Sequence, residues 1–444
     1  MNSVYKSSKA FLITLLIFAS TAMAYAPQLA GDFGNVQIHW KTPVIRIALS
    51  NSLTRQNPNI RPNSDVAGAI QRSLETWEKA ADIKFQTSWT DKQTISPAGV
   101  SGDGVSLITI AQTPENLLFF AADAEEASAR TRTFYNRRGF ITEADIVLNP
   151  YQQFSTDGSF GTFDLESILT HEIGHLLGLE HSFVLGATMN ALQGKNGIYN
   201  LYAFSPRTLA EDDIAAVRAI YGAKNVDDDC CGEINGRLSL FNGKPAKDFQ
   251  VWAEEPETGR VISGVSTNSD GSFRFEGLPA GEYSIYSQKI GDKGENSFLT
   301  ENLGSIEVQS GKQIDFVRKL QNKPDTFNLQ YAGFNAQIAA LAVPVNAGKS
   351  YTLYLGGKNF DADEISIVFN SPYISAVPNS FANHDYGTDV SVISFDVKIS
   401  GKTPVGEYGI YVKRSGGKVE CLPGSLVVES SENLVNTNVI LVNE

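Results

Sequence analysis

The chain of 444 residues has few cysteines, few histidines and a deficit of basic residues. Three cysteines are too few for a disulfide-stapled scaffold. Lys and Arg number 36 against 49 Asp and Glu, and this balance excludes the basic footprint of a general nucleic-acid-binding protein. Only five histidines are present, so their placement is informative. The length predicts roughly two to four domains.

Long hydrophobic runs are absent except for a short one near the start. Lys6 and Lys9 precede an apolar stretch at 11–19, and small residues follow at 22–24 (AMA). This order is typical of a secretory signal peptide. A membrane anchor is the alternative, but the stretch is well short of the ~20 apolar residues that a spanning helix needs. We predict a signal peptide at 1–24, no transmembrane segment after its removal, and a secreted protein, extracellular or periplasmic.

The pattern of apolar and turn-forming residues changes near Gly222. Residues 27–224 read as one mixed α/β domain that ends there, with strands expected at 44–48, 105–110, 127–135 and 141–148, and helices at 64–81, 165–177 and 208–221. After an acidic linker at 225–231, helical periodicity gives way to short alternating segments broken by Gly, Pro and Asn. These predict two all-β sandwich domains, at 232–320 and 325–430, followed by a tail at 431–444.

A segment that occurs twice in similar form supports the prediction of two sandwiches. Residues 279–286 (PAGEYSIY) resemble residues 404–411 (PVGEYGIY). Each is predicted to be a turn that leads into a strand.

Three of the five histidines lie in one segment, 171–181 (HEIGHLLGLEH). His171 and His175 are four residues apart, so on a helix both face one Zn²⁺. Gly178 can end the helix, after which His181 can return to the same metal. Three nitrogen ligands leave a fourth position for water, as a catalytic zinc requires. Glu172 is placed to act as a general base rather than as a metal ligand.

The pattern HExxHxxGxxH followed by a methionine turn resembles the metzincin signature. The candidate turn is 187–190 (ATMN), and Ser182 after the third histidine indicates the matrixin branch, peptidase family M10. The resemblance covers roughly 36–224 and implies a twisted, mainly parallel sheet with three helices. It implies a zinc endopeptidase that acts on protein or peptide substrates, with Met189 as an apolar floor under the metal.

The resemblance also implies an edge strand that pairs with an extended substrate. We assign this strand to 127–135, with Thr131, Thr133 and Phe134 as contact residues. An ordinary, fully paired strand is the alternative.

The β-domains carry resemblances of their own. The first resembles the carboxypeptidase-regulatory-like and Cna-B-like sandwich family, on the segments 234–236, 256–259, 270–273 and 278–283. The second resembles immunoglobulin-like folds of bacterial surface proteins. A cell-surface or matrix target of these modules is therefore expected.

Metal content and disulfide pairing depart from the matrixin pattern. No cysteine precedes Cys230, so latency through a pro-segment cysteine is not expected. Only His39 and His384 lie outside the motif, so one zinc is expected and a second histidine-bound zinc is not. Calcium stays open, because aspartates cluster in sequence at Asp145, Asp157 and Asp164, although acidic loop residues are more often only solvated. Export permits one disulfide, which we expect between Cys421 and either Cys230 or Cys231.

Two other functions compete with a secreted endopeptidase. One is a catalytically weak adhesion or binding protein on a metzincin scaffold. The other is an amidase that acts on cell-wall peptides. Retention of His171, His175, His181 and Glu172 favours the enzyme.

Overall fold

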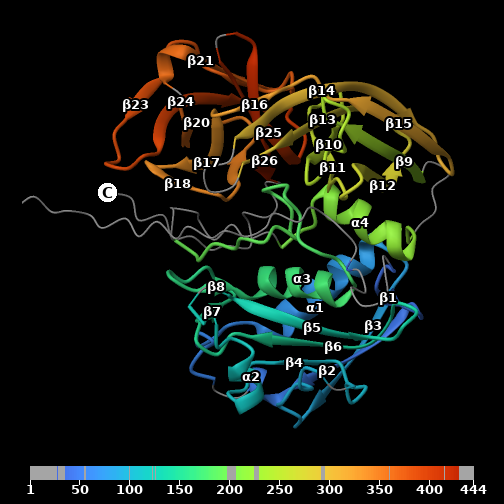
Figure 1. The fold of residues 1–444 in the computed structure, drawn as a ribbon. Coiled ribbons are helices and arrows are strands. Elements are labelled where there is room, and N and C mark those ends of the chain that lie inside the picture. Colours follow the sequence, from blue (N-terminus) through green and yellow to red (C-terminus); the bar gives the residue numbers. More distant parts are fainter. Residues whose placement is uncertain are drawn as a thin grey trace, which may run out of the picture.

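The fold is shown by a computed structural model (Figure 1). The structure describes residue 28 and residues 36–429, apart from 55–56, 100, 123, 126, 198–206, 225–229, 292–295, 360 and 415. The predicted signal peptide at 1–24, most of the predicted linker at 225–231 and the predicted tail at 431–444 therefore lie outside the described residues. Within them, no helix is both long and apolar enough to cross a membrane.

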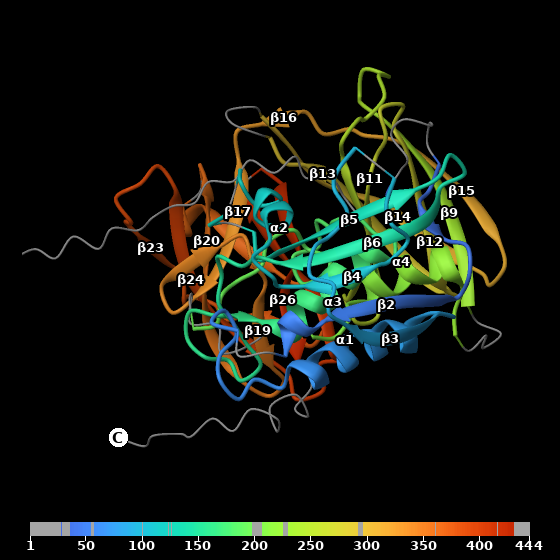
Figure 2. The same cartoon turned by 90° about the horizontal axis from the view of Figure 1, so that it is seen from below.

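The N-terminal part is built on a six-stranded sheet in the order β1-β6-β4-β2-β3, with β5 on the outer side of β6. All pairs are parallel except β5 with β6. Its strands are β1 (His39–Trp40), β2 (Val44–Ser50), β3 (Lys84–Thr90), β4 (Leu107–Thr109), β5 (Ala129–Tyr135) and β6 (Phe140–Leu148). Among the described strands β5 pairs with β6 alone, so its other edge is free of strand pairing. Figure 2 shows β5 and β6 side by side, seen from below.

Helices α1 (Val66–Ala80) and α3 (Leu165–Leu176) cover one face of this sheet (Figure 1). Asp65 caps α1 by accepting from Gly68 N, and Asp164 caps α3 by accepting from Ser167 N. The Trp77 indole of α1 donates to Thr170 O of α3 over 2.8 Å. Every residue of α3 is buried, so this helix is fixed on all sides. Three short elements complete this part: α2 (Pro114–Leu118), β7 (Phe154–Ser155) and β8 (Phe163–Asp164).

The last helix of this part, α4 (Glu211–Tyr221), begins later than the sequence predicts. Asp213 Oδ2 accepts a hydrogen bond of 2.9 Å from Ala210 N, which makes Ala210 the cap. Thr208 O instead accepts from the Thr188 hydroxyl over 2.8 Å. The predicted start at residue 208 is wrong because the Asp213 carboxylate, and not the Thr208 side chain, forms the capping hydrogen bond at the start of the helix.

The middle part is a β-sandwich of two sheets, β11-β10-β13-β14-β16 and β12-β9-β15. We call it the middle module. Its strands are β9 (Cys230–Ser239), β10 (Gln250–Glu254), β11 (Val261–Ser266), β12 (Ser272–Pro279), β13 (Gly281–Lys289), β14 (Ser297–Val308), β15 (Gln313–Lys319) and β16 (Pro324–Asp325).

The last part, the last module, is a second sandwich with sheets β18-β17-β20-β24-β22, joined by β23, and β19-β26-β25-β21. The predicted fold class, an α/β domain followed by all-β sandwiches, is confirmed. The strands are β17 (Asn328–Phe334), β18 (Gln337–Ala339), β19 (Val343–Asn346), β20 (Ser350–Lys358), β21 (Ile365–Val368), β22 (Ile374–Ala376), β23 (Ala382–His384), β24 (Ser391–Ile399), β25 (Gly406–Arg414) and β26 (Lys418–Glu429).

The echoed segments adopt the same local geometry in both modules. The Tyr283 hydroxyl donates to Pro279 O over 2.8 Å, and the Tyr408 hydroxyl donates to Pro404 O over 2.8 Å. Each tyrosine closes the turn that precedes its own strand, as the repeated sequence predicts.

The cysteine pairing differs from the prediction. Cys230 and Cys231 are bonded to each other, and Cys421 is a buried free thiol. Cys230 starts β9, where it pairs with Pro279, whereas Cys421 packs with Trp252 and Tyr411 between the two modules. The predicted bridge to Cys421 is wrong because these cysteines belong to different parts of the β-region.

The α/β part and the middle module share one hydrophobic core. The same buried cluster contains Val217 of α4 and Ile234 and Phe275 of the middle module. Gly277 has a φ of 67°, and a Cβ added there would lie 2.1 Å from Ala215 O of α4. Helix α4 therefore packs directly against strand β12, without a solvated gap between the two parts.

Candidate active site

The three histidines of the motif converge on one point. His171 and His175 lie one turn apart on α3, and His181 follows the turn at Gly178, which has a φ of 92°. One nitrogen from each ring lies within 4.8 Å of the others. His175 Nε2 and His181 Nε2 are 3.1 Å apart. In the part of the chain that the structure describes, this is the one group of three or more potential metal ligands.

Backbone carbonyls orient two of the rings. Thr188 O lies 2.7 Å from His171 Nδ1, and Leu179 O lies 2.8 Å from His175 Nδ1. A carbonyl can only accept, so each Nδ1 carries the proton and each Nε2 keeps its lone pair. Such outer partners are what hold metal-binding imidazoles in place.

Burial keeps the three rings neutral. It lowers the pKa of His171 well below its usual value, and it lowers the pKa of His175 to about 3. The same cause lowers the pKa of His181. Metal binding needs neutral imidazole, so the protonation state fits Zn²⁺ as well as the geometry does.

Glu172 contacts the edge strand and is not a member of the histidine ligand group. Its Oε2 accepts a hydrogen bond of 2.6 Å from Thr131 Oγ1 of β5. Burial raises the pKa of Glu172 to about 7, against the lowering effects of that hydrogen bond and of the Arg130 charge. A carboxyl group with this pKa can take and return a proton near neutrality.

Met189 packs beneath the catalytic helix. Its side chain is 1% exposed, and a Cβ added to Gly174 would lie 2.2 Å from the Met189 sulfur. Gly174 lies between His171 and His175 on α3, so a larger residue at this position would displace the end of the Met189 side chain.

The predicted substrate strand is the free edge strand β5, but its three named residues differ in environment. Thr131 contacts Glu172, as above, and Thr133 Oγ1 is buried without a hydrogen-bond partner. Phe134 is half-buried. The sequence predicted Thr131 as a substrate contact. Its hydrogen bond to Glu172 was not predicted, because no local sequence pattern indicates it.

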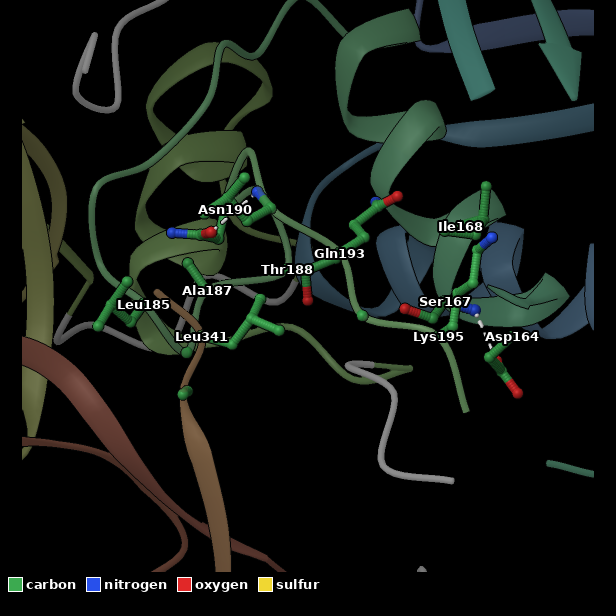
Figure 3. Close-up of a pocket in the computed structure, with 14 residues that line it drawn as sticks. Asp164, Ser167, Ile168, Leu185, Ala187, Thr188, Asn190, Gln193, Lys195 and Leu341 are labelled. Carbon is green, nitrogen blue, oxygen red and sulfur yellow. Dashed lines mark hydrogen bonds between the residues drawn. The ribbon is translucent and has the colours of Figure 1, made fainter. Parts of the chain in front are cut away.

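A small cavity is lined by residues of α3 and of the segment around Met189 (Figure 3). Ile168, one helical turn before His171, and Thr188, whose carbonyl holds the His171 ring, both line it. Its other walls include Leu192 and Gln193 from the segment after Met189, and Leu341 from the last module. The cavity measures about 50 Å³. Gln193 also contacts Ser128, which precedes β5, so the cavity lies next to the edge strand.

The three aspartates considered as possible calcium ligands each accept hydrogen bonds from a different part of the chain. Both carboxylate oxygens of Asp145 accept backbone N–H groups, from Leu107 and Ser96. Asp157 accepts from Ser159, and Asp164 caps α3. They form no common ligand group within the described residues.

Comparison with known proteins identifies the N-terminal part. Residues 39–222 match the profile of the family described as Matrixin. This part of the chain belongs to the matrixin family of metalloendopeptidases. The matrixin domain is 28% identical over 174 residues to interstitial collagenase of Oryctolagus cuniculus, covering 38% of this chain and 32% of that protein. It is 27% identical over 181 residues to metalloendoproteinase 1 of Glycine max, covering 37% and 48%.

The chain thus spans about a third and about a half of the length of these two relatives. Among solved structures, it resembles the major pilin subunit BcpA of Bacillus cereus at 15% identity and a TM-score of 0.19, covering 44% of this chain and 69% of that one. It also resembles domains 4 and 5 of the S-layer protein SbsC at 13% identity and a TM-score of 0.14, covering 41% and 77%.

Two acidic residues at the start of α4, which were not predicted as site residues, also contact the site. Asp213 accepts from Thr188 N and Met189 N over 2.8 and 3.0 Å. Asp212 accepts from the Ser182 hydroxyl over 2.5 Å. The two carboxylates thus tie both ends of the segment between His181 and Met189. The adjacent pair Asp212-Asp213 is a visible signal, but which loop it holds is set by tertiary packing.

Proposed function

We propose that this protein is a secreted zinc endopeptidase that hydrolyses peptide bonds of extracellular proteins. The observation that carries the proposal is the convergence of His171, His175 and His181 next to Glu172 on the same helix, a buried carboxyl group that is not a member of the ligand group. His171, His175 and His181 would hold one Zn²⁺. When bound, the metal would lower the pKa of a water toward ~7 and polarise the scissile carbonyl.

Glu172 is the proton carrier in this proposal. Its Oε2 is held by Thr131, and its raised pKa suits a group that accepts a proton from the attacking water and then donates it to the leaving amine.

Strand β5 would align the substrate. Its free edge offers main-chain N–H and C=O groups to an extended peptide. A peptide added there lies next to Thr131, and so next to Glu172 and the metal ligands. The scissile bond and the base are then brought together by the same strand.

The cavity lined by Ile168 and Thr188 would receive one substrate side chain. Ile168, Leu192 and Leu341 supply aliphatic surface to its lining, while Asp164 and Lys195 supply charged groups. A volume of about 50 Å³ exceeds the ~10–15 Å³ that a single water requires, but it leaves little room for a large ring. We expect a preference for a small or medium aliphatic side chain at one position beside the cleaved bond.

Secretion and the target of the modules complete the proposal. The signal-like start of the sequence supports export, and the modules would bind a cell-surface or matrix component that bears the substrate. Glu172, Thr131 and the ligands act on any peptide, so the modules would supply the preference for location.

Digestion of a mixed peptide library tests the proposal. Wild-type protein should cut internal peptide bonds, lose that activity with a chelator and regain it when Zn²⁺ is added. The Glu172→Gln variant is the control for contaminating proteases, since it keeps the size and the three ligands. Equal cleavage by both proteins, or cleavage insensitive to the chelator, would contradict the proposal and favour the adhesion alternative. Activity on cell-wall peptides alone would favour the amidase.

A further inference from the structure

The segment between His181 and Met189 lies in a junction of all three parts of the chain. Phe183, Val184 and Ala187 from this segment share one buried cluster with Trp252 and Val261 of the middle module and with Tyr411 and Cys421 of the last module. Val184 is fully buried. The outer wall of the segment that follows the third histidine is thus made of β-module residues.

The middle module contacts this segment through Gly264 of β11. Gly264 N donates to Asp212 Oδ1 over 2.7 Å, while Asp212 Oδ2 accepts from Ser182 Oγ. One buried carboxylate thus joins the residue after His181 to the backbone of the middle module. A Cβ added to Gly264 would lie 2.9 Å from both Phe183 and Val184, so the contact is close.

The last module contacts the same segment through β26. Leu185 N donates to Pro423 O over 3.0 Å, a main-chain hydrogen bond between the matrixin domain and the last module. A Cβ added to Gly424 would lie 2.4 Å from Val184 Cγ1, and one added to Gly186 would lie 2.6 Å from Val427 Cγ2. Backbone meets backbone here with no space for larger residues.

We propose that the two β-modules hold residues 182–188 in place, and that through this segment they position His181 and the carbonyl of Thr188 that orients His171. The inference rests on the proposed zinc site and extends it from the matrixin domain to both modules. Asp212, Gly264 and Gly424 are positioning residues, since none of them touches the metal position or a substrate. The functional unit is then the whole described chain and not residues 39–222 alone.

Two glycines of the β25–β26 region provide a matched test in the full-length protein. Gly424 and Gly417 both have positive φ values, 68° and 79°, so alanine causes similar backbone strain at each. A Cβ at Gly424 meets Val184, whereas a Cβ at Gly417 meets nothing within 4 Å. The Gly424→Ala variant should bind Zn²⁺ about 10–100-fold more weakly in a chelator competition, the range found for outer-shell changes. The Gly417→Ala variant should match the wild type.

Two further measurements connect the effect to the segment itself. The Co²⁺-loaded Gly424→Ala protein should show a shifted visible absorption spectrum, because the spectrum reports ligand geometry, while Gly417→Ala should superimpose on wild type. Adding Val184→Ala to Gly424→Ala removes the atom that the new Cβ meets and should restore part of the zinc affinity. Equal zinc affinity and identical spectra for both glycine variants would overturn the inference.

A second pair covers the case in which Gly424→Ala does not fold. Val184 and Val412 are both fully buried, but Val412 lies in the core of the last module and not in the segment 182–188. Val184→Ala should weaken zinc binding several-fold more than Val412→Ala at equal loss of thermal stability. Equal zinc affinities would overturn the inference. These readouts use no substrate, so a wild type that binds zinc without cleaving peptides refutes the proposed function and leaves this inference standing.

Discussion

The hydroxyl of Thr131 donates a hydrogen bond of 2.6 Å to Oε2 of Glu172. The donor lies on the free edge strand and the acceptor on the helix that carries two histidines. The proposed base is therefore oriented by the same strand that would bind the substrate. This contact connects substrate alignment to proton transfer, and it can be tested separately from either.

We expect Thr131→Val to move the acid limb of the pH–rate profile. The Thr131 hydrogen bond lowers the pKa of Glu172, so its loss should raise that pKa. Glu172 acts as a base only above its pKa, and kcat/KM should fall more at pH 6 than at pH 8. Thr133→Val is the control, because Thr133 lies two residues along the same strand and its hydroxyl has no hydrogen-bond partner. An identical profile for both variants would exclude Thr131 from this role.

Glu172→Gln should abolish most turnover without releasing the metal. General acid–base groups contribute about 10²–10⁴ in rate, so kcat should fall by at least that range. Zinc content by elemental analysis and the melting temperature should stay close to wild type. His175→Ala should lose zinc and activity together. Normal cleavage by Glu172→Gln would show that another group carries the proton.

Leu341→Ala should change side-chain preference more than rate. Leu341 of the last module lines the same cavity as Ile168 and Thr188, and its truncation enlarges that cavity. Peptide-library cleavage should shift toward longer aliphatic side chains at one position. Leu118→Ala is a control on an exposed leucine of the matrixin domain. An unchanged preference would place the substrate side chain elsewhere.

Glu407 should make stability depend on pH. Burial, together with the charges of Asp213, Glu211 and Asp212, raises the pKa of Glu407 to about 8. Between the ordinary value near 4.5 and about 8, the folded protein holds a proton that the unfolded chain releases. Stability is therefore lost as pH rises through this window, by no more than about 5 kcal/mol at roughly 1.4 kcal/mol per pKa unit.

The variant Glu407→Gln should raise the melting temperature at pH 8 and change it little at pH 5. Glu282→Gln is the matched control, because Glu282 occupies the same place in the echoed segment and is exposed. Thermal unfolding of both variants at the two pH values measures the difference. A similar response of both would mean that Glu407 is solvated in the folded protein.

A fragment of residues 36–224 should fold poorly on its own. The sequence predicts a catalytic unit that ends near Gly222, but the structure places α4 and Val184 in cores completed by the modules. The fragment should aggregate or bind zinc much more weakly than the full chain in chelator competition. A soluble fragment with full zinc affinity would show that the matrixin domain needs neither module.

Local patterns predicted the parts of the protein that depend on local physics. Helical spacing placed His171 and His175 together, and a glycine turn brought His181 to them. Alternation and turns predicted the two sandwiches, and the repeated PxGEY segment predicted two like corners at Tyr283 and Tyr408.

Contacts between distant segments could not be predicted in this way. Nothing near Thr131 in sequence signals Glu172, and nothing near Leu185 signals Pro423. The cysteine prediction failed for the same reason, since Cys421 on β26 packs in the junction and Cys230 is bonded to Cys231 instead. Register and packing between modules decide these contacts, and a single sequence carries no local trace of them.

The hydrogen bond from Leu185 N to Pro423 O also has a consequence for the order in which the protein matures during synthesis. A ribosome or export channel releases the histidine motif long before it releases β26, so on the inference above the proteolytic centre would mature only when nearly all of the described chain has emerged. The order of synthesis would then delay proteolytic activity until the last module has formed, independently of any inhibitory peptide.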